Sequence, residues 1–230
     1  MIFGGIQKLS LIDFPGKVSA VVFAAGCDFS CPYCHNPELV TVKSAQTLDE
    51  DEVLAFLEKR KVMLDGVVVT GGEPTLQPGL LDFLRKIRKM GYKVKLDTNG
   101  GHPQALVQVL RAKLVDYVAM DIKTAPRLYP ELVCESVTQE VIEDSIRVIM
   151  ESGVDYEFRT TCAPGFVDPA LVEEMARALD GAKLWIFQKM ATTKMLRPEF
   201  FKNLPPVPDP AAMARFSAQA AAHVRRASIR

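Results

Sequence analysis

The chain has 230 residues, of which 48% are hydrophobic and 24% are charged, as in a folded globular protein with a substantial core. Its 28 Lys and Arg side chains balance its 28 Asp and Glu side chains, so we expect no nucleic-acid partner and no membrane-surface role. No apolar run approaches the roughly 18 residues of a membrane span, and the first five residues lack the layout of a signal peptide. We therefore expect a cytoplasmic protein.

Strand-like and helix-like segments alternate along the chain. Short apolar runs predict six strands, at 18–24, 66–70, 93–97, 116–121, 155–161 and 183–188. Periodic segments between them predict helices at 49–61, 79–90, 103–112 and 168–179. A further helix is predicted to begin at a cap formed by Ser136 and Gln139 and to run to Gly153. Thr47 and Glu50 have the spacing of a capping box before the first helix.

Such βα units predict an α/β protein with a parallel sheet and right-handed crossovers. A flat doubly wound sheet and a curved, barrel-like sheet both fit the pattern. We expect residues 1–204 to form this domain and residues 205–230 to form a C-terminal segment. In that segment the proline-rich stretch 205–210 is a linker, and 211–226 is a terminal helix.

Three of the five cysteines, Cys27, Cys31 and Cys34, lie within eight residues directly after the first predicted strand. In a reducing compartment such a group is typical of metal binding rather than of disulfides. Three thiolates from one loop can hold three irons of a [4Fe–4S] cluster and leave the fourth iron open for a ligand.

The alternatives to an iron–sulfur cluster are a structural zinc site and free core cysteines. Zinc ordinarily takes four protein ligands in paired knuckles, and the second knuckle is absent from the sequence. His35 adjoins Cys34 and is poorly placed to reach the same metal, so we favour the open cluster. For Cys134 and Cys162 we favour the simple interpretation of small buried or half-buried residues.

Polar side chains follow several other predicted strands, where barrel folds assemble their active sites. The second strand ends in Gly71, Gly72 and Glu73; the glycines permit close approach of a ligand, and the acid can pair with an ammonium group. The next three strands end in Asp97, Thr98, Asp121, Lys123 and Arg159. Such charges are costly to bury unless they meet a ligand or ion. The alternatives are a helix cap for Asp97, a surface position for Lys123 and a core salt bridge for Arg159.

The loop Cys27–Asn36 resembles the signature of the radical S-adenosylmethionine superfamily. Tyr33–Asn36 and Asp13–Gly16 are similar to the activating enzymes of glycyl-radical proteins, and Gly5–Gly16 resembles most the branch that activates anaerobic ribonucleoside-triphosphate reductase. The resemblance extends from about Gly4 to Gln188.

The resemblance implies a partial (β/α)6 barrel with outer helices, a [4Fe–4S] cluster on the three cysteines and S-adenosylmethionine. The Gly-Gly-Glu motif would receive the amino group and Lys123 would pair with the carboxylate. Tyr33, inside the cysteine loop, is placed to pack on the adenine, and packing within the loop is the alternative. It also implies a monovalent cation at Asp97, Thr98 and Asp121. Gln188 stands where some relatives have a cofactor-contacting histidine. The full cofactor-binding set is Tyr33, His35, Asn36, Gly71, Gly72, Glu73, Asp97, Thr98, Asp121, Lys123 and Arg159.

The implied reaction is reductive cleavage of S-adenosylmethionine, with the resulting 5′-deoxyadenosyl radical abstracting hydrogen from a glycine of a partner enzyme. The predicted partner is anaerobic ribonucleoside-triphosphate reductase, and no catalytic residue is expected beyond the cluster and cofactor ligands. Because the chain lacks the cysteines of additional ferredoxin-like clusters, a flavodoxin or ferredoxin would supply the electron. The alternatives are a small-molecule radical enzyme, such as a deazapurine-pathway synthase, and a non-catalytic metal-binding module.

Overall fold

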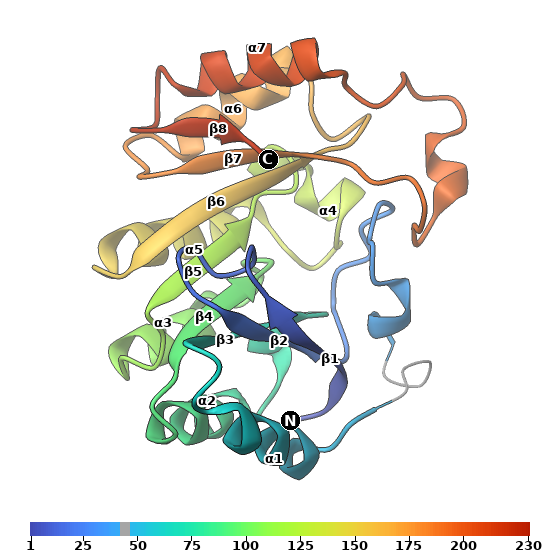
Figure 1. Cartoon of the computed structure of the whole chain (residues 1–230). Coiled ribbons are helices and arrows are strands. Elements are labelled where there is room, and N and C mark those ends of the chain that lie inside the picture. Colours follow the sequence, from blue (N-terminus) through green and yellow to red (C-terminus); the bar gives the residue numbers. More distant parts are fainter. Residues whose placement is uncertain (42–46) are drawn as a thin grey trace. The chain divides into compact units, whose positions relative to one another are not determined.

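The structure, a computed structural model, describes residues 1–41 and 47–230 (Figure 1). These residues form two compact units, each built from several stretches of the chain. The first unit comprises Met1–Asp28, Glu38–Thr98 and Gln104–Val118, and the second comprises Phe29–Pro37, Asn99–Pro103 and Ala119–Arg230.

The first unit contains four neighbouring strands: β1 (Phe3–Ser10), β2 (Ser19–Ala24), β3 (Gly66–Gly71) and β4 (Lys93–Thr98). The pairs β2–β3 and β3–β4 are parallel, as the alternation of strands and helices predicts. The intervening helices are α1 (Glu50–Arg60) and α2 (Leu80–Lys89), and α3 (Pro103–Arg111) follows β4. Consecutive valines at positions 67–69 of β3 are fully buried, which fits a strand covered on both faces.

Strand β1 was not predicted, and it pairs antiparallel with β2. Gly4 and Gly5 weaken its intrinsic strand preference, and two register shifts interrupt its pairing. Strand formation here therefore depends on the neighbouring β2. The predicted capping box also lies two residues further along, because Asp49 and Glu52 exchange the side-chain and backbone hydrogen bonds that begin α1.

The second unit contains the strands β6 (Asp155–Cys162), β7 (Trp185–Lys189) and β8 (Ala227–Ile229), which pair in parallel. Strand β5 (Tyr117–Asp121) begins in the first unit and ends in the second. The helices are α4 (Tyr129–Leu132), α5 (Gln139–Glu151), α6 (Pro169–Ala178) and α7 (Pro210–Ala220), with short 3-10 turns that include η4 (Pro126–Leu128) and η5 (Pro198–Phe201). Helix α5 follows Thr138 rather than the expected cap at Ser136.

The C-terminal segment differs from its prediction in length. Asp209 caps α7 by accepting a hydrogen bond from the Ala212 amide at 2.7 Å, and the helix ends at Ala220 rather than at residue 226. The remaining residues include β8, which the sequence did not predict. Helix α7 packs against α6 and β7. The domain division at residue 204 stays a prediction.

All six predicted strands are present with bounds shifted by at most two residues, and the α/β class is confirmed. Among the described residues, no helix is both long enough and apolar enough to span a membrane.

Candidate active site

The Gly71–Gly72 pair brings the end of β3 against the loop that follows β2. The Gly72 amide donates to the Ala24 carbonyl at 2.8 Å, and the Glu73 amide donates to the Gly26 carbonyl at 2.8 Å. A Cβ on Gly72 would lie 2.0 Å from the Gly26 oxygen, and Gly71 has a φ of +119°. The glycines are therefore required for contact between two protein loops, one of which carries Cys27.

The Glu73 side chain is fully buried at the end of β3. Its Oε1 accepts hydrogen bonds from the Thr75 amide at 3.0 Å and the Thr75 hydroxyl at 2.5 Å. The Thr98 hydroxyl, at the end of β4, donates to the same oxygen at 2.9 Å. A buried carboxylate needs such donors, and these three fix its orientation. Thr98, expected among the cofactor and cation ligands, is thus a Glu73 partner.

Asp97 has a partner that the sequence did not indicate. The Lys95 Nζ donates to its Oδ1 at 2.5 Å, and the two side chains are 1% and 11% exposed. We missed Lys95 because a lysine in a strand is normally solvent-exposed. Its two-residue separation from Asp97, which places both on one face of β4, was the available signal.

Cys27 is half-buried in the first unit, and its amide donates to the Val40 carbonyl at 3.2 Å. The stretch Met1–Asp28 of the first unit ends one residue after Cys27. Cys31 and Cys34 lie in the stretch Phe29–Pro37, which belongs to the second unit. Three residues lie between Cys27 and Cys31, so the chain limits the separation of their Cα atoms to roughly 14 Å.

The second unit carries a tight turn in which the Cys34 amide donates to the Cys31 carbonyl at 3.0 Å. Cys31 is buried and Cys34 is half-buried. Between them, the buried Tyr33 ring packs edge-on against Phe166 with ring centroids 4.9 Å apart. Among the described residues its hydroxyl has no hydrogen-bond partner. His35 is exposed and Asn36 is half-buried.

Two distant segments hold this cysteine turn in place. The Ser30 amide and hydroxyl both donate to the Val133 carbonyl, at 3.1 and 3.2 Å. The Arg197 amide donates to the Pro32 carbonyl at 3.0 Å, and its guanidinium donates to the Ser30 carbonyl at 2.6 Å. The sequence pattern did not indicate Arg197, because this residue lies outside the predicted βα units.

Asp121, Lys123 and Arg159 form one ion-paired group in the second unit. Lys123 Nζ and Arg159 Nε each donate to an Asp121 carboxylate oxygen at 2.8 Å. Burial by itself would raise the pKa of Asp121, but Arg159 and Lys123 outweigh it and hold that pKa well below its usual range. Burial by itself would lower the pKa of Lys123. The negative charge of Asp121 outweighs this effect, so the pKa of Lys123 is raised.

Lys123 also lies close enough to the cysteine turn to affect it electrostatically. Burial raises the pKa of the Cys31 thiol to about 11, and the positive charge of Lys123 is the largest influence in the opposite direction. Burial likewise raises the pKa of Tyr33, again opposed first by Lys123. The second unit therefore places the charges of Lys123 and Asp121 within electrostatic reach of Cys31.

Gln188 lies opposite Thr161 in the β6–β7 register, and Ile186 lies opposite Arg159. Residues two apart share a face of a strand, so Gln188 and Arg159 face the same side. Cys162 is buried at the end of β6, where burial raises its pKa to about 12. The Cys134 sulfur contacts the Ser136 hydroxyl at 3.3 Å.

The donor set suits an iron–sulfur cluster, because the described cysteines are free thiols and three lie in one loop. Within the described parts of the chain, no group of three His, Cys, Asp or Glu side chains is arranged as a metal site. The Tyr33 hydroxyl, which lacks a partner among the described residues, lies in the turn between Cys31 and Cys34 and fits a binding site for a further polar ligand. A monovalent cation fits less well, because the ammonium of Lys95 already contacts Asp97.

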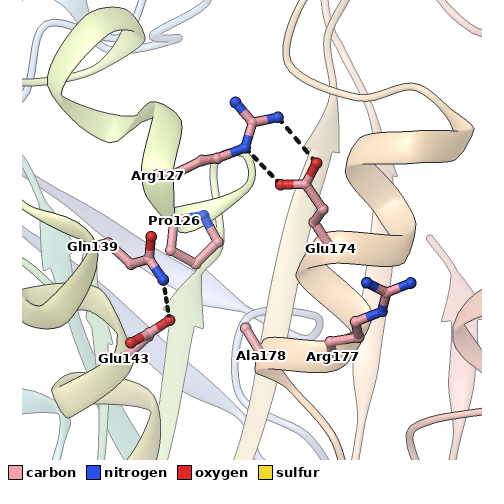
Figure 2. Close-up of a pocket in the computed structure, with 7 residues that line it drawn as sticks. All are labelled: Pro126, Arg127, Gln139, Glu143, Glu174, Arg177 and Ala178. Atoms are coloured by element: carbon pink, nitrogen blue, oxygen red, sulfur yellow. Dashed lines mark hydrogen bonds and ion pairs between the residues drawn. The ribbon is translucent and has the colours of Figure 1, made fainter.

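A separate pocket lies on the second unit between η4, α5 and α6 (Figure 2). Its lining residues are Pro126, Arg127, Gln139, Glu143, Glu174, Arg177 and Ala178. Arg127 donates twice to Glu174, at 2.8 and 2.9 Å, and Gln139 donates to Glu143 (Figure 2). Arg177 pairs with Glu173 outside the lining. Because these charged and polar groups have partners of their own, we assign the pocket no part in the chemistry.

The sequence profile of the Radical SAM superfamily matches residues 21–179, which include most of β2, the cysteine loop and the strands β3 to β6. The chain belongs to the radical S-adenosylmethionine superfamily. It is 36% identical over 207 residues to a Methanocaldococcus jannaschii protein that carries the provisional name glycyl-radical enzyme activating enzyme, with 87% of this chain and 84% of the relative covered.

It is also 36% identical over 123 residues to the pyruvate formate-lyase-activating enzyme of Clostridium pasteurianum, a match that covers 51% of this chain and 50% of that relative. Among solved structures, Streptococcus suis SuiB bound to S-adenosylmethionine matches with a TM-score of 0.69 at 14% identity. That match covers 91% of this chain and 49% of SuiB.

These comparisons confirm the predicted radical SAM partial-barrel fold and place the chain among the glycyl-radical enzyme activating enzymes. The chain is therefore a radical SAM enzyme, and the superfamily uses a [4Fe–4S] cluster and S-adenosylmethionine.

Proposed function

We propose that this radical SAM enzyme activates anaerobic ribonucleoside-triphosphate reductase by removing a hydrogen atom from a glycine of that partner. The activation of a glycyl-radical enzyme has the support of the relatives described above. The choice of partner is supported by the opening Gly5–Gly16, which resembles the branch that acts on this reductase. A flavodoxin or ferredoxin would provide the electron.

Cys27, Cys31 and Cys34 would hold the cluster as thiolates. When bound and reduced, the cluster supplies the electron that cleaves the C5′–S bond of S-adenosylmethionine and yields the 5′-deoxyadenosyl radical. The residues of the chain keep the cysteine loop in place and exclude water from it. Ser30 and Arg197 hold the turn through four hydrogen bonds, and Cys31 is already buried.

The observation that carries the proposal is the ion-paired group of Asp121, Lys123 and Arg159, whose lysine acts electrostatically on Cys31 and Tyr33. S-adenosylmethionine has a carboxylate, and the Lys123 ammonium has three N–H donors, more than its bond to Asp121 uses. Lys123 would therefore pair with the methionine carboxylate. Arg159 would donate to the carboxylate or to the ribose.

Glu73 would receive the methionine amino group. Its Oε1 is held by Thr75 and Thr98, and burial strengthens the attraction between a carboxylate and an ammonium group. Gly71 and Gly72 keep this carboxylate next to the loop that bears Cys27. Tyr33, His35 and Asn36 would contact the rest of the cofactor.

The test uses anaerobically reconstituted enzyme with S-adenosylmethionine, a reductant and purified anaerobic ribonucleotide reductase. The expected result is a glycyl-radical signal in electron paramagnetic resonance together with one 5′-deoxyadenosine per radical. Pyruvate formate-lyase serves as the control partner. Activation of the control alone would overturn the choice of partner, and turnover of a small molecule without any protein partner would favour the small-molecule alternative.

A further inference from the structure

Residues 189–204, which include the end of β7 and the turn η5, lie against the cysteine turn of the second unit. The Arg197 amide donates to the Pro32 carbonyl at 3.0 Å, and the Arg197 guanidinium donates to the Ser30 carbonyl at 2.6 Å. Ser30 and Pro32 flank Cys31 in the sequence. A molecule that binds to residues 189–204 would therefore lie close to two of the three cysteines in the loop.

A row of aromatic rings leads from the cysteine turn to this segment. Tyr33 packs edge-on against Phe166, the Phe166 ring centroid lies 5.8 Å from that of Phe200, and the Phe200 and Phe201 centroids are 5.1 Å apart. Tyr33 and Phe166 are buried, whereas Phe200 and Phe201 are half-buried. The other half-buried apolar side chains of residues 189–204 are Met195, Leu196 and Leu204. The segment thus offers several apolar side chains to a partner.

The same segment is strongly cationic, although the formal net charge of the whole chain is zero. Residues 189–204 carry four Lys or Arg side chains and a single acid, Glu199. Lys189 and Lys202 are exposed, and within the described parts of the chain neither forms an ion pair with an acid. Apolar side chains accompanied by exposed cations complement a partner whose binding face is acidic.

The electron donor is the partner that has to approach the cysteine turn most closely, because electron transfer requires a short distance between the two redox groups. An acidic flavodoxin suits the segment in two respects. Its carboxylates complement the lysines, and the aromatic edge of its flavin complements the phenylalanine rings.

We propose that residues 189–204 form the docking surface for the electron donor, an acidic flavodoxin whose flavin edge contacts Phe200 and Phe201 and whose carboxylates pair with Lys189 and Lys202. The inference rests on the proposed function, in which an external carrier supplies the electron. The anionic flavin hydroquinone gives up one electron to the metal site and becomes the neutral semiquinone, and no bond forms or breaks. The segment lies outside residues 21–179, which match the superfamily profile.

The experiment measures the affinity of oxidised flavodoxin for the reconstituted holoenzyme by anaerobic titration calorimetry at about 0.02 M and about 0.3 M salt. For the natural sequence we expect binding that weakens on the order of tenfold at the higher salt concentration. Lys189→Glu and Lys202→Glu should each bind roughly fivefold more weakly at low salt and nearly normally at high salt, because salt screens exposed charges.

Two variants serve as controls. Lys202→Arg keeps the charge and should bind as the natural sequence does. Arg147→Glu makes the same change of net charge on α5, where the Arg147 side chain is 63% exposed, and it should leave the affinity nearly unchanged. The reduction rate gives a second readout, since Lys202→Glu should be reduced more slowly by flavodoxin hydroquinone and at the normal rate by dithionite.

Equal affinities for Lys189→Glu, Lys202→Glu and Arg147→Glu at low salt would overturn the inference and leave the proposed function intact. Weaker binding of the ribonucleotide reductase to the two lysine variants, with flavodoxin binding unchanged, would overturn it as well and assign the surface to the reductase. Tighter, Lys202-dependent binding of a ferredoxin would overturn the choice of flavodoxin. If dithionite reduces the holoenzyme but S-adenosylmethionine is not cleaved, the proposed function fails, and the binding data still decide the docking surface.

Discussion

The Thr98 hydroxyl at the end of β4 donates to the Glu73 carboxylate at the end of β3, at 2.9 Å. This bond joins two strand ends that were expected to contribute separately to a cofactor site. Because Glu73 is fully buried, its orientation depends on the donors around it.

The Thr98–Glu73 bond gives the first prediction. Thr98→Val keeps the shape of the side chain but removes the donor, which should cost about 1.5–3 kcal/mol in S-adenosylmethionine binding. Thr98→Ser retains a hydroxyl and should bind nearly as the natural sequence does. Equilibrium dialysis on the reconstituted proteins measures both. Equal affinities for the valine and serine variants would remove Thr98 from the positioning of Glu73.

The Gly72–Gly26 approach gives the second prediction. Gly72→Ala places a Cβ 2.0 Å from the Gly26 carbonyl oxygen, so the β3 loop and the Cys27 loop must separate. We expect a loss of several kcal/mol in the free energy of unfolding and a reduced iron content. Gly5→Ala in β1 meets no atom within 4 Å and should be nearly neutral. Urea denaturation and iron analysis test the pair, and a stable, fully loaded Gly72→Ala would contradict the packing described.

The ion-paired group at Asp121 gives a pH-dependent prediction. The pKa of Asp121 is depressed in the folded state, so its stabilisation is fully present above the unfolded value of about 3.9 and is lost as the pH falls through the folded value. Asp121→Asn should therefore cost about 2 kcal/mol at pH 7, and the cost should be constant down to about pH 5 and then shrink.

The control for Asp121 is Asp144, whose surface pair with Arg147 should be worth less than about 1 kcal/mol. Urea denaturation of the cluster-free proteins between pH 3 and pH 8 gives the differences. A cost for Asp121→Asn that does not change with pH would contradict the assigned ion pair.

Two buried cysteines make a matched pair for the fourth prediction. Cys31→Ala should abolish the bound iron and sulfide, because only two of the three loop thiolates would remain. Cys162→Ala should retain the cluster and lose only about 1 kcal/mol of stability, since Cys162 is a buried strand residue. Iron and sulfide analysis after anaerobic reconstitution distinguishes them. Cluster loss in both variants would make Cys162 part of the site.

The sequence pattern predicted the elements whose own residues determine them. Strands β2 to β7 are apolar runs between turns, and their bounds were predicted to within two residues. Strands β1 and β8 were missed because their pairing with β2 and β7 stabilises them more than their composition does. Helix α7 ends early for a related reason, since the last residues of the chain pair with β7 instead of extending the helix.

For the candidate site, sequence motifs indicated which residues matter but not which of them contact one another. The motifs singled out Glu73, Thr98 and Asp121, while the Thr98–Glu73 bond became apparent only from the structure. Lys95 and Arg197 were missed because a strand lysine and a loop arginine are ordinarily solvated. Tertiary packing buries Lys95 beside Asp97, and it places Arg197 where its guanidinium bonds to the cysteine turn.

The most direct test of the central claim is the analysis of anaerobically reconstituted protein for metal, sulfide and 5′-deoxyadenosine. We predict about four irons and four sulfides per chain, with 5′-deoxyadenosine formed from S-adenosylmethionine only when a reductant is present. Zinc without sulfide, or a loaded cluster that never cleaves S-adenosylmethionine, would contradict the account.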